Sequence, residues 1–101
     1  MRADAMTGQD LKTAIESPDP FVRTDALARA DSASDAIVAA LTDDYPLVRR
    51  EAVRALGRRC DEEAARVLLR AAAHDPAAEV REEAVSALAG MMRHLYPAER
   101  S

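Results

Sequence analysis

Hydrophobic and polar residues follow a helical period in three segments of the chain, 22–30, 48–56 and 80–88. Apolar residues recur three or four positions apart in each segment, with polar residues between them. These apolar positions are Val22, Ala26, Leu27, Ala30, Val48, Ala52, Val53, Leu56, Val80, Ala84, Val85 and Leu88. The pattern predicts three amphipathic α-helices, each with one buried face.

Each of these helices is preceded by a start signal. The dipeptides Asp19-Pro20 and Asp75-Pro76 place a capping carboxylate before a proline, which fits the first helical position because its missing N–H costs nothing there. Pro46 follows Asp44 one residue later and predicts the same kind of start. The three helices are therefore expected to begin at or just after these residues.

A further amphipathic segment lies before each of the three helices and predicts a partner for it. The apolar residues of these segments are Leu11, Ala14, Ile15, Ile37, Val38, Ala40, Leu41, Ala64, Val67, Leu68 and Ala71. Thr7 with Asp10 forms a loose capping box for the first partner, the polar residues 32–34 precede the second, and Asp61 precedes the third. No alternating strand pattern competes, so six helices of roughly 9–20 residues are expected.

The three longer helices also share a repeated motif. Val-Arg, one variable residue, an acid, alanine, and Leu or Val recur three times, with the valines 26 and 32 residues apart. Repeats of this kind are typical of solenoids. The sequence predicts an all-α fold, a short α-solenoid of three stacked antiparallel helix pairs at about 7–31, 32–59 and 60–96. One domain would span 7–96, between flexible tails at 1–6 and 97–101.

The motif Asp-Pro-x-Val-Arg-x-x-Ala-x-x-Ala-Leu-Gly resembles the second helix of a HEAT repeat. The match is best in 44–57 and 75–90, where Ala-Leu-Gly and Ala-Leu complete it. The repeat is short and looks like the variety found in phycobilin lyases. The resemblance implies stacked helix pairs whose second helices line a concave groove, and a role in binding other proteins.

Composition narrows the classes of function. The chain has 101 residues, enough for one domain, and 32% of them are charged, which excludes a membrane protein. The net charge of −4 gives no global basic field, so nucleic-acid binding is the least favoured interaction. Cys60 is the only cysteine and no signal peptide precedes the helices, so a cytoplasmic protein is expected, with Cys60 as a small packed residue at a helix start.

No catalytic or cofactor-binding constellation stands out. A HEAT-repeat hydroxylase would carry His-Glu pairs for a di-iron centre, but the equivalent pairs here are Thr24-Asp25, Arg50-Glu51 and Glu82-Glu83. Without clustered His or Cys there is no ligand set for a transition metal. We therefore expect no cofactor, no metal and no enzyme activity, with a subunit of a heteromeric enzyme such as a lyase as the alternative.

Charged residues recur in two columns of the repeat. We expect them to form a structural ladder rather than a binding stripe, because they occur in every repeat. The arginine column is Arg23, Arg49 and Arg81, and the acidic column is Asp25, Glu51 and Glu83.

Two features depart from the repeat and are candidate binding surfaces. The first is an arginine stripe with four-residue spacing, which would dock an acidic peptide or helix or else be a solvated face: Arg50, Arg54, Arg58 and Arg59. The second is an apolar C-terminal end that would form an interface, a homodimer included, or fold back over the third pair: Met91, Met92, Leu95 and Tyr96. The prediction for function is a non-catalytic interaction module acting as an adaptor, scaffold or regulatory subunit.

Overall fold

The computed structural model describes residues 8–30 and 35–96, and all regular structure in that part of the chain is helical. The elements are α1 (Gly8–Ile15), α2 (Pro20–Ala28), α3 (Asp35–Ala39), the 3-10 helix η1 (Ala40–Thr42), α4 (Pro46–Arg59), α5 (Glu62–His74) and α6 (Ala78–Leu95). The predicted all-α class is therefore confirmed. None of the described helices is long and apolar enough to cross a membrane.

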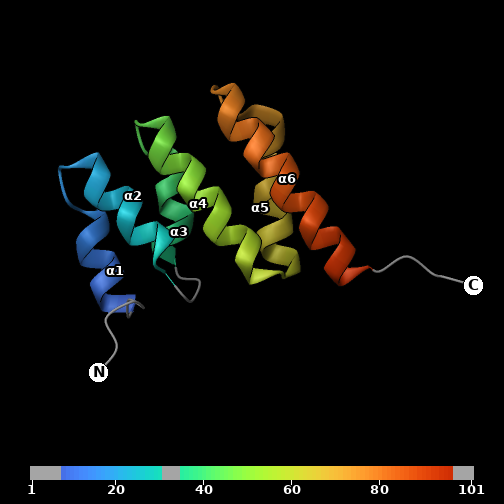
Figure 1. The fold of residues 1–101 in the computed structure, drawn as a ribbon, viewed down its shortest axis with the longest axis horizontal. Helices are drawn as coiled ribbons and strands as arrows, with labels where there is room; N and C mark the ends of the chain where they lie inside the picture. Colours follow the sequence, from blue (N-terminus) through green and yellow to red (C-terminus); the bar gives the residue numbers. More distant parts are fainter. Residues whose placement is uncertain (1–7, 31–34, 97–101) are drawn as a thin grey trace, which may run out of the picture.

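The helices stack into an open, flat solenoid (Figure 1). Helix α4 lies between α2 and α6 and packs against both, so these three helices form a continuous layer. The remaining helices form a second layer against this one. Helix α1 contacts α2, α3 and η1 both contact α4, and α5 contacts α4 and α6. The extents of the structure, 50 × 37 × 17 Å, are those of a plate about two helices thick.

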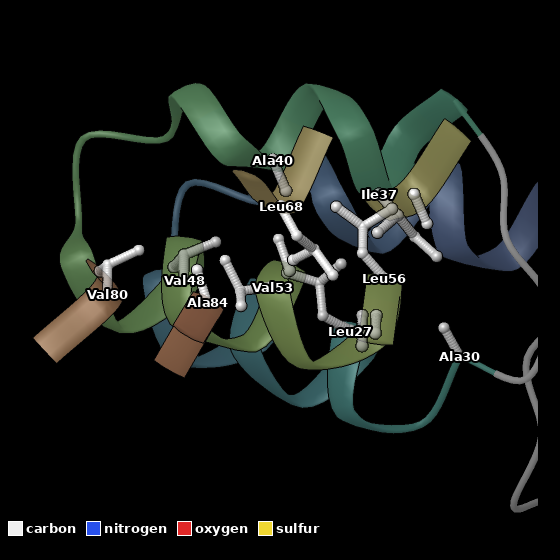
Figure 2. Packing of buried hydrophobic residues seen from close by; sticks show 14 of the residues in the cluster. Leu27, Ala30, Ile37, Ala40, Val48, Val53, Leu56, Leu68, Val80 and Ala84 are labelled. Atoms are coloured by element: carbon white, nitrogen blue, oxygen red, sulfur yellow. The ribbon is translucent and has the colours of Figure 1, made fainter. Parts of the chain in front are cut away.

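The core runs along the middle of this plate. Figure 2 shows Leu27, Val53 and Leu56 of the α2 and α4 layer gathered with Ile37 and Leu68 from the opposite layer. Each of these side chains is at most 1% exposed. Burying a side chain of this size stabilises the fold by about 1.5–3 kcal/mol, so the predicted apolar faces are what hold the layers together.

The predicted starts of α2 at Pro20 and of α4 at Pro46 are confirmed, whereas the predicted cap of α4 and the start of α6 need correction. Asp19 caps α2 as predicted, accepting a hydrogen bond from the Phe21 N–H at 2.9 Å. Asp44 does not cap α4, whose N-cap is Tyr45, and α6 begins at Ala78 rather than at Pro76. The reason is that the turns before α4 and α6 are arranged around aspartates that also bind an arginine of the preceding repeat.

The partner helices are shorter than predicted at the N-terminal end of the stack. Asp61 caps α5 as expected, accepting from the Ala64 N–H at 2.7 Å. Helix α3, however, has only 5 residues before it tightens into η1, where the Thr42 hydroxyl donates to the Ala39 carbonyl at 2.9 Å. Thr7, residues 32–34 and the expected tails at 1–6 and 97–101 lie outside the described residues.

Cys60 ends a helix and does not start one. It is the C-cap residue of α4 and adopts a left-handed conformation with φ 54°, and the next residue, Asp61, is the N-cap of α5. Its half-buried thiol packs against the core and lies 3.7 Å from the Gly57 carbonyl oxygen. The prediction of a helix start is wrong because the chain reverses direction within this single residue.

Candidate interaction surface

The arginine column forms the polar link between consecutive repeats. In each repeat the guanidinium Nη1 donates to the backbone carbonyl six residues earlier, which belongs to Ser17 for Arg23 (2.6 Å), to Asp43 for Arg49 (2.7 Å) and to Asp75 for Arg81 (2.7 Å). These bonds fix the turn that precedes each longer helix. The arginines therefore satisfy carbonyl groups that the turn leaves without a backbone donor.

Two of these arginines also bind a carboxylate of the next repeat. Arg23 holds both oxygens of Asp43, at 2.7 and 3.1 Å, and Arg49 holds both oxygens of Asp75, at 3.0 and 3.2 Å. The Arg49 and Asp75 side chains are 10% and 6% exposed. Two parallel bonds in such a site fix geometry as well as adding energy, so each pair sets how one repeat is seated on the next.

The Asp43 carboxylate is held in its charged form. Partial burial alone would raise its pKa, but hydrogen bonds from Arg23 and the Tyr45 N–H, with the charges of Arg23 and Arg49, outweigh burial. The pKa of Asp43 is therefore lowered. Correspondingly, the hydrogen bond to Asp43 raises the pKa of Arg23.

The acidic column contacts other arginines. Asp25 pairs with Arg29 at 2.9 Å on the surface of α2. The remaining two carboxylates lie over the layer of longer helices, where Glu51 accepts from Arg54 at 2.8 Å and Glu83 lies 3.1 Å from it. The carboxylates bound by the arginine column are thus those of the turns, and the acidic column belongs to a second charged network.

This second network contains the arginine stripe. Arg50 and Arg54 reach from α4 to Glu83 on α6, at 3.4 and 3.1 Å, and the hydrogen bond to Glu83 raises the pKa of Arg54. Arg58 turns the other way and donates from Nη2 to the Leu27 and Ala30 carbonyls, at 3.0 and 3.1 Å. It therefore caps the C-terminus of α2 and ties α4 to it.

The fourth arginine of the stripe lies apart from the others. Arg59 contacts Asp61 at 3.0 Å and Glu63 at 3.1 Å, beside the turn into α5. The pKa of Asp61 is lowered, first by the hydrogen bond from the Ala64 N–H and then by Arg59. Only Arg50 and Arg54, with side chains 36% and 40% exposed, combine an ion pair across the helices with substantial access to solvent.

An open furrow of about 510 Å³ runs between α4 and α6 beside Arg54, and Arg50 lines a smaller hollow that shares Glu83 and Ser86 with it. Its floor is made of small residues, and a Cβ atom on Gly57 would lie only 3.1 Å from the Cβ of Ala87, so the two helices approach closely. Its lining residues are Arg54, Gly57, Arg58, Cys60, Glu83, Ser86, Ala87, Gly90, Met91 and His94. The sequence did not single out Ser86 or His94 as lining residues, because only the packing of α6 beside α4 brings them to the furrow.

The C-terminal apolar residues divide between core and surface. Met91 is only 1% exposed and belongs to the core, and Leu95 is half-buried against it. Met92 and Tyr96 are exposed, at 45% and 56%. The Tyr96 hydroxyl donates to Glu62 at 3.0 Å, which raises the pKa of the phenol. The predicted apolar interface therefore loses Met91, whose side chain is covered by the fold itself.

No constellation for metal binding is found in residues 8–30 and 35–96. In that part of the chain no three His, Cys, Asp or Glu side chains lie close enough together to hold a metal ion. The carboxylates of the networks described above are paired with guanidinium groups, while Arg58 and Arg81 bind backbone carbonyls. The chemistry that this surface offers is therefore charge-assisted hydrogen bonding.

Stacked helix pairs linked by a repeated arginine define the molecule as an α-solenoid. Residues 24–89 match the family model for HEAT repeats, which covers more than half of the chain. The chain belongs to the HEAT-repeat family. No curated protein and no solved structure gives a significant match to it.

Proposed function

We propose that this chain is a non-catalytic protein-binding module, an adaptor, scaffold or regulatory subunit, that binds an acidic peptide or helix on the face formed by α2, α4 and α6. The observation that carries the proposal is the pair Arg50 and Arg54, of which Arg54 lines the open furrow and Arg50 lines the smaller hollow that shares Glu83 with it. HEAT repeats commonly mediate protein–protein interaction. The arginine column, in contrast to the arginine stripe, is bound to groups of the fold itself. On this face, partly exposed guanidinium groups that bridge two helices lie beside an open furrow.

The guanidinium N–H donors that face solvent at this edge favour a partner with acidic side chains. Glu83 lies between two arginines and is shared by both, and Glu51 pairs with Arg54 only. A guanidinium carries five N–H donors, so these contacts leave donors that face solvent. An acidic side chain of a partner would complete the hydrogen bonding of Arg50 and Arg54 without breaking the bridge between α4 and α6.

The same charges argue against nucleic acid. The stripe is balanced locally by Glu51, Glu83, Asp61 and Glu63. Binding to a phosphate backbone draws its energy from uncompensated positive charge and release of counterions. With the net charge of the chain at −4, this surface lacks that driving force.

The test is affinity capture from the native host with the double variant Arg50→Glu/Arg54→Glu. A matched control is Arg66→Glu/Arg70→Glu, which makes the same charge change with the same spacing on exposed residues of α5. The proposal predicts a stoichiometric protein that is lost from the first variant and retained by the second. A partner retained by both variants, or lost equally from both, would contradict it.

A third variant separates binding from folding. Arg50→Glu/Arg54→Glu/Glu83→Arg reverses every charge of the bridge between α4 and α6, so the internal ion pairs are restored with opposite polarity. We expect its melting temperature to be closer to the wild-type value than that of the double variant, while the acidic partner is still lost. An activity that arises only when chain and partner are mixed would instead indicate a heteromeric enzyme.

A further inference from the structure

The last helix carries a copy of the buried surface of the middle helix. The buried residues of α4 are Val48, Arg49, Ala52, Val53, Ala55 and Leu56. The residues 32 positions later in α6 are identical in type: Val80, Arg81, Ala84, Val85, Ala87 and Leu88. The same side chains are therefore presented twice, at the same spacing, on two helices of the same layer.

The two copies are covered to different extents. Val53 is fully buried, and so is Leu27, which holds the same repeat position in α2. Val85 is 57% exposed, and Leu88 is only partly buried whereas its counterpart Leu56 is fully buried. The cause is position in the stack, because α4 is flanked by α2 and α6 whereas α6 is the last helix of the described chain (Figure 1).

The polar link is also incomplete at this end. Arg23 and Arg49 each bind both oxygens of an aspartate from the following repeat. Arg81 makes the bond to the carbonyl of its own turn, at 2.7 Å. Within residues 8–30 and 35–96, however, no carboxylate pairs with its guanidinium. The exposed apolar residues of α6 thus lack a covering helix, and Arg81 lacks the aspartate of a following repeat.

We propose that the end surface of α6, formed by Arg81, Val85, Leu88 and Met92, docks a helix pair from a different protein, with an aspartate in the turn between its helices. That aspartate would bind Arg81 as Asp75 binds Arg49, and an apolar helix face would cover Val85. The residues of the end surface recur three or four positions apart, so they form one stripe along α6. The proposal adds a second surface to the proposed interaction role and shares no residue with the arginine stripe.

The occupant is a different chain because a second copy does not offer the required acid. The turn of the first repeat has Ser17 where the later turns have Asp43 and Asp75, and its Oγ accepts the Asp19 N–H at 3.1 Å. A copy stacked head to tail would therefore bring the Ser17 hydroxyl to the position of that aspartate, while Asp19 of the same turn caps α2 through the Phe21 N–H. Within residues 35–96, α6 passes the position equivalent to Cys60 without reversing and continues to Leu95.

The test grafts onto α6 the segment that covers the equivalent surface of α4. Residues after Met91 are replaced by a copy of residues 60–101, so that the copied aspartate follows Arg81 by 26 residues, the spacing between Arg49 and Asp75. We expect the melting temperature to rise by about 5 °C or more, since another apolar surface is buried. In the grafted chain Arg81→Ala should lower the melting temperature by more than it does in the native chain.

The copied aspartate supplies the control. Replacing it with asparagine should lower the melting temperature of the grafted chain as Arg81→Ala does, and the two changes together should cost less than their sum. An unchanged melting temperature on grafting, or an Arg81→Ala effect that is equal in the native and grafted chains, would overturn the proposal.

Sedimentation of the native chain tests the choice of occupant. A monomer at concentrations up to about 100 µM is the expected result, because weak self-association with Kd below this value would already be visible. A dimer that is lost in Val85→Glu would show that a second copy occupies the surface, and would overturn the assignment to a different protein. The variant Arg50→Glu/Arg54→Glu leaves the end surface intact, so failure of the proposed function would not alter either result.

Discussion

Helices α4 and α6 present the same six side chains in two different surroundings. In α4, Val53 and Arg49 are buried, and Arg49 binds an aspartate of the next repeat, whereas in α6 the equivalent Val85 is exposed and Arg81 binds only the carbonyl of its own turn. The repeat motif thus determines which residues are able to form a core. Whether they do so depends on the neighbour, as expected for a solenoid in which each repeat contacts only adjacent ones.

The largest difference in stability between equivalent variants of α4 and α6 is expected at the arginine of the motif, Arg49 or Arg81. Arg49→Ala leaves the nearly buried Asp75 carboxylate without its partner, so we expect a loss of about 3 kcal/mol in the free energy of unfolding. Arg81→Ala removes one bond to a carbonyl and should cost about 1 kcal/mol. Urea denaturation of both variants measures the difference. Equal losses would show that the inter-repeat pair adds nothing.

Lysine at position 49 separates the effect of charge from that of hydrogen-bond geometry. Arg49→Lys keeps the charge but cannot bind both oxygens of Asp75 and the Asp43 carbonyl in the geometry of the fork. We expect it to recover less than half of the stability lost in Arg49→Ala. Full recovery would mean that charge alone matters here.

The valines give a smaller effect whose sign differs between the helices. Val53→Ala opens a cavity in the core and should cost about 2 kcal/mol. Val85→Ala removes an exposed side chain from a helix, where alanine has the better propensity, so stability should be unchanged or rise by about 0.5 kcal/mol. Thermal unfolding monitored by circular dichroism tests both. A loss at Val85 similar to that at Val53 would contradict the different burial.

Acid should weaken the link between the first two repeats. The pKa of Asp43 is lowered in the fold, so its carboxylate contributes stability above the unfolded pKa of about 3.9, and this contribution is lost as pH falls through the lower folded value. Asp43→Asn should therefore reduce stability at pH 7 and flatten its decline below pH of about 4. Asp44→Asn, on an exposed neighbouring residue, is the control for loss of charge. Parallel curves for Asp43→Asn and wild type would contradict this account.

The smallest effect concerns the turn that α6 lacks. Cys60 ends α4 in a left-handed conformation that favours glycine, so Cys60→Gly should be more stable than Cys60→Ala, which also loses the packed thiol, by about 0.5 kcal/mol. Cys60→Ala keeps the strained backbone and serves as the control. Differential scanning calorimetry resolves such a shift, and a lower melting temperature for the glycine variant than for the alanine variant would contradict it.

Much of the fold was predictable because the apolar period and the repeat columns are local patterns. Val48, Val53 and Leu56 follow the helical period, and their burial follows from it. The partners of Arg49 were not predictable in the same way. Asp75 was interpreted as a helix cap, since a cap and an ion-pair partner use the same carboxylate and only the stacked structure brings Arg49 to it.

The candidate binding surfaces were harder to predict than the core, because neighbouring residues of one helix point in different directions. Met91 and Met92 are adjacent in the sequence, yet the first is core and the second is surface. Likewise Arg54 and Arg58 are one turn apart, but Arg54 faces Glu83 whereas Arg58 caps α2. Helical spacing identified the stripe, while the register of α4 against its two neighbours decides which group each guanidinium binds.

Thiol labelling tests most directly the claim that one motif is covered in α4 and open in α6. In a Cys60→Ala background, Val53→Cys and Val85→Cys each place a single thiol at equivalent positions. We expect a thiol-specific reagent to modify the Val85→Cys chain at least about 100-fold faster than the Val53→Cys chain, because the thiol at position 53 reacts only when the core opens. Similar rates for both chains would contradict it.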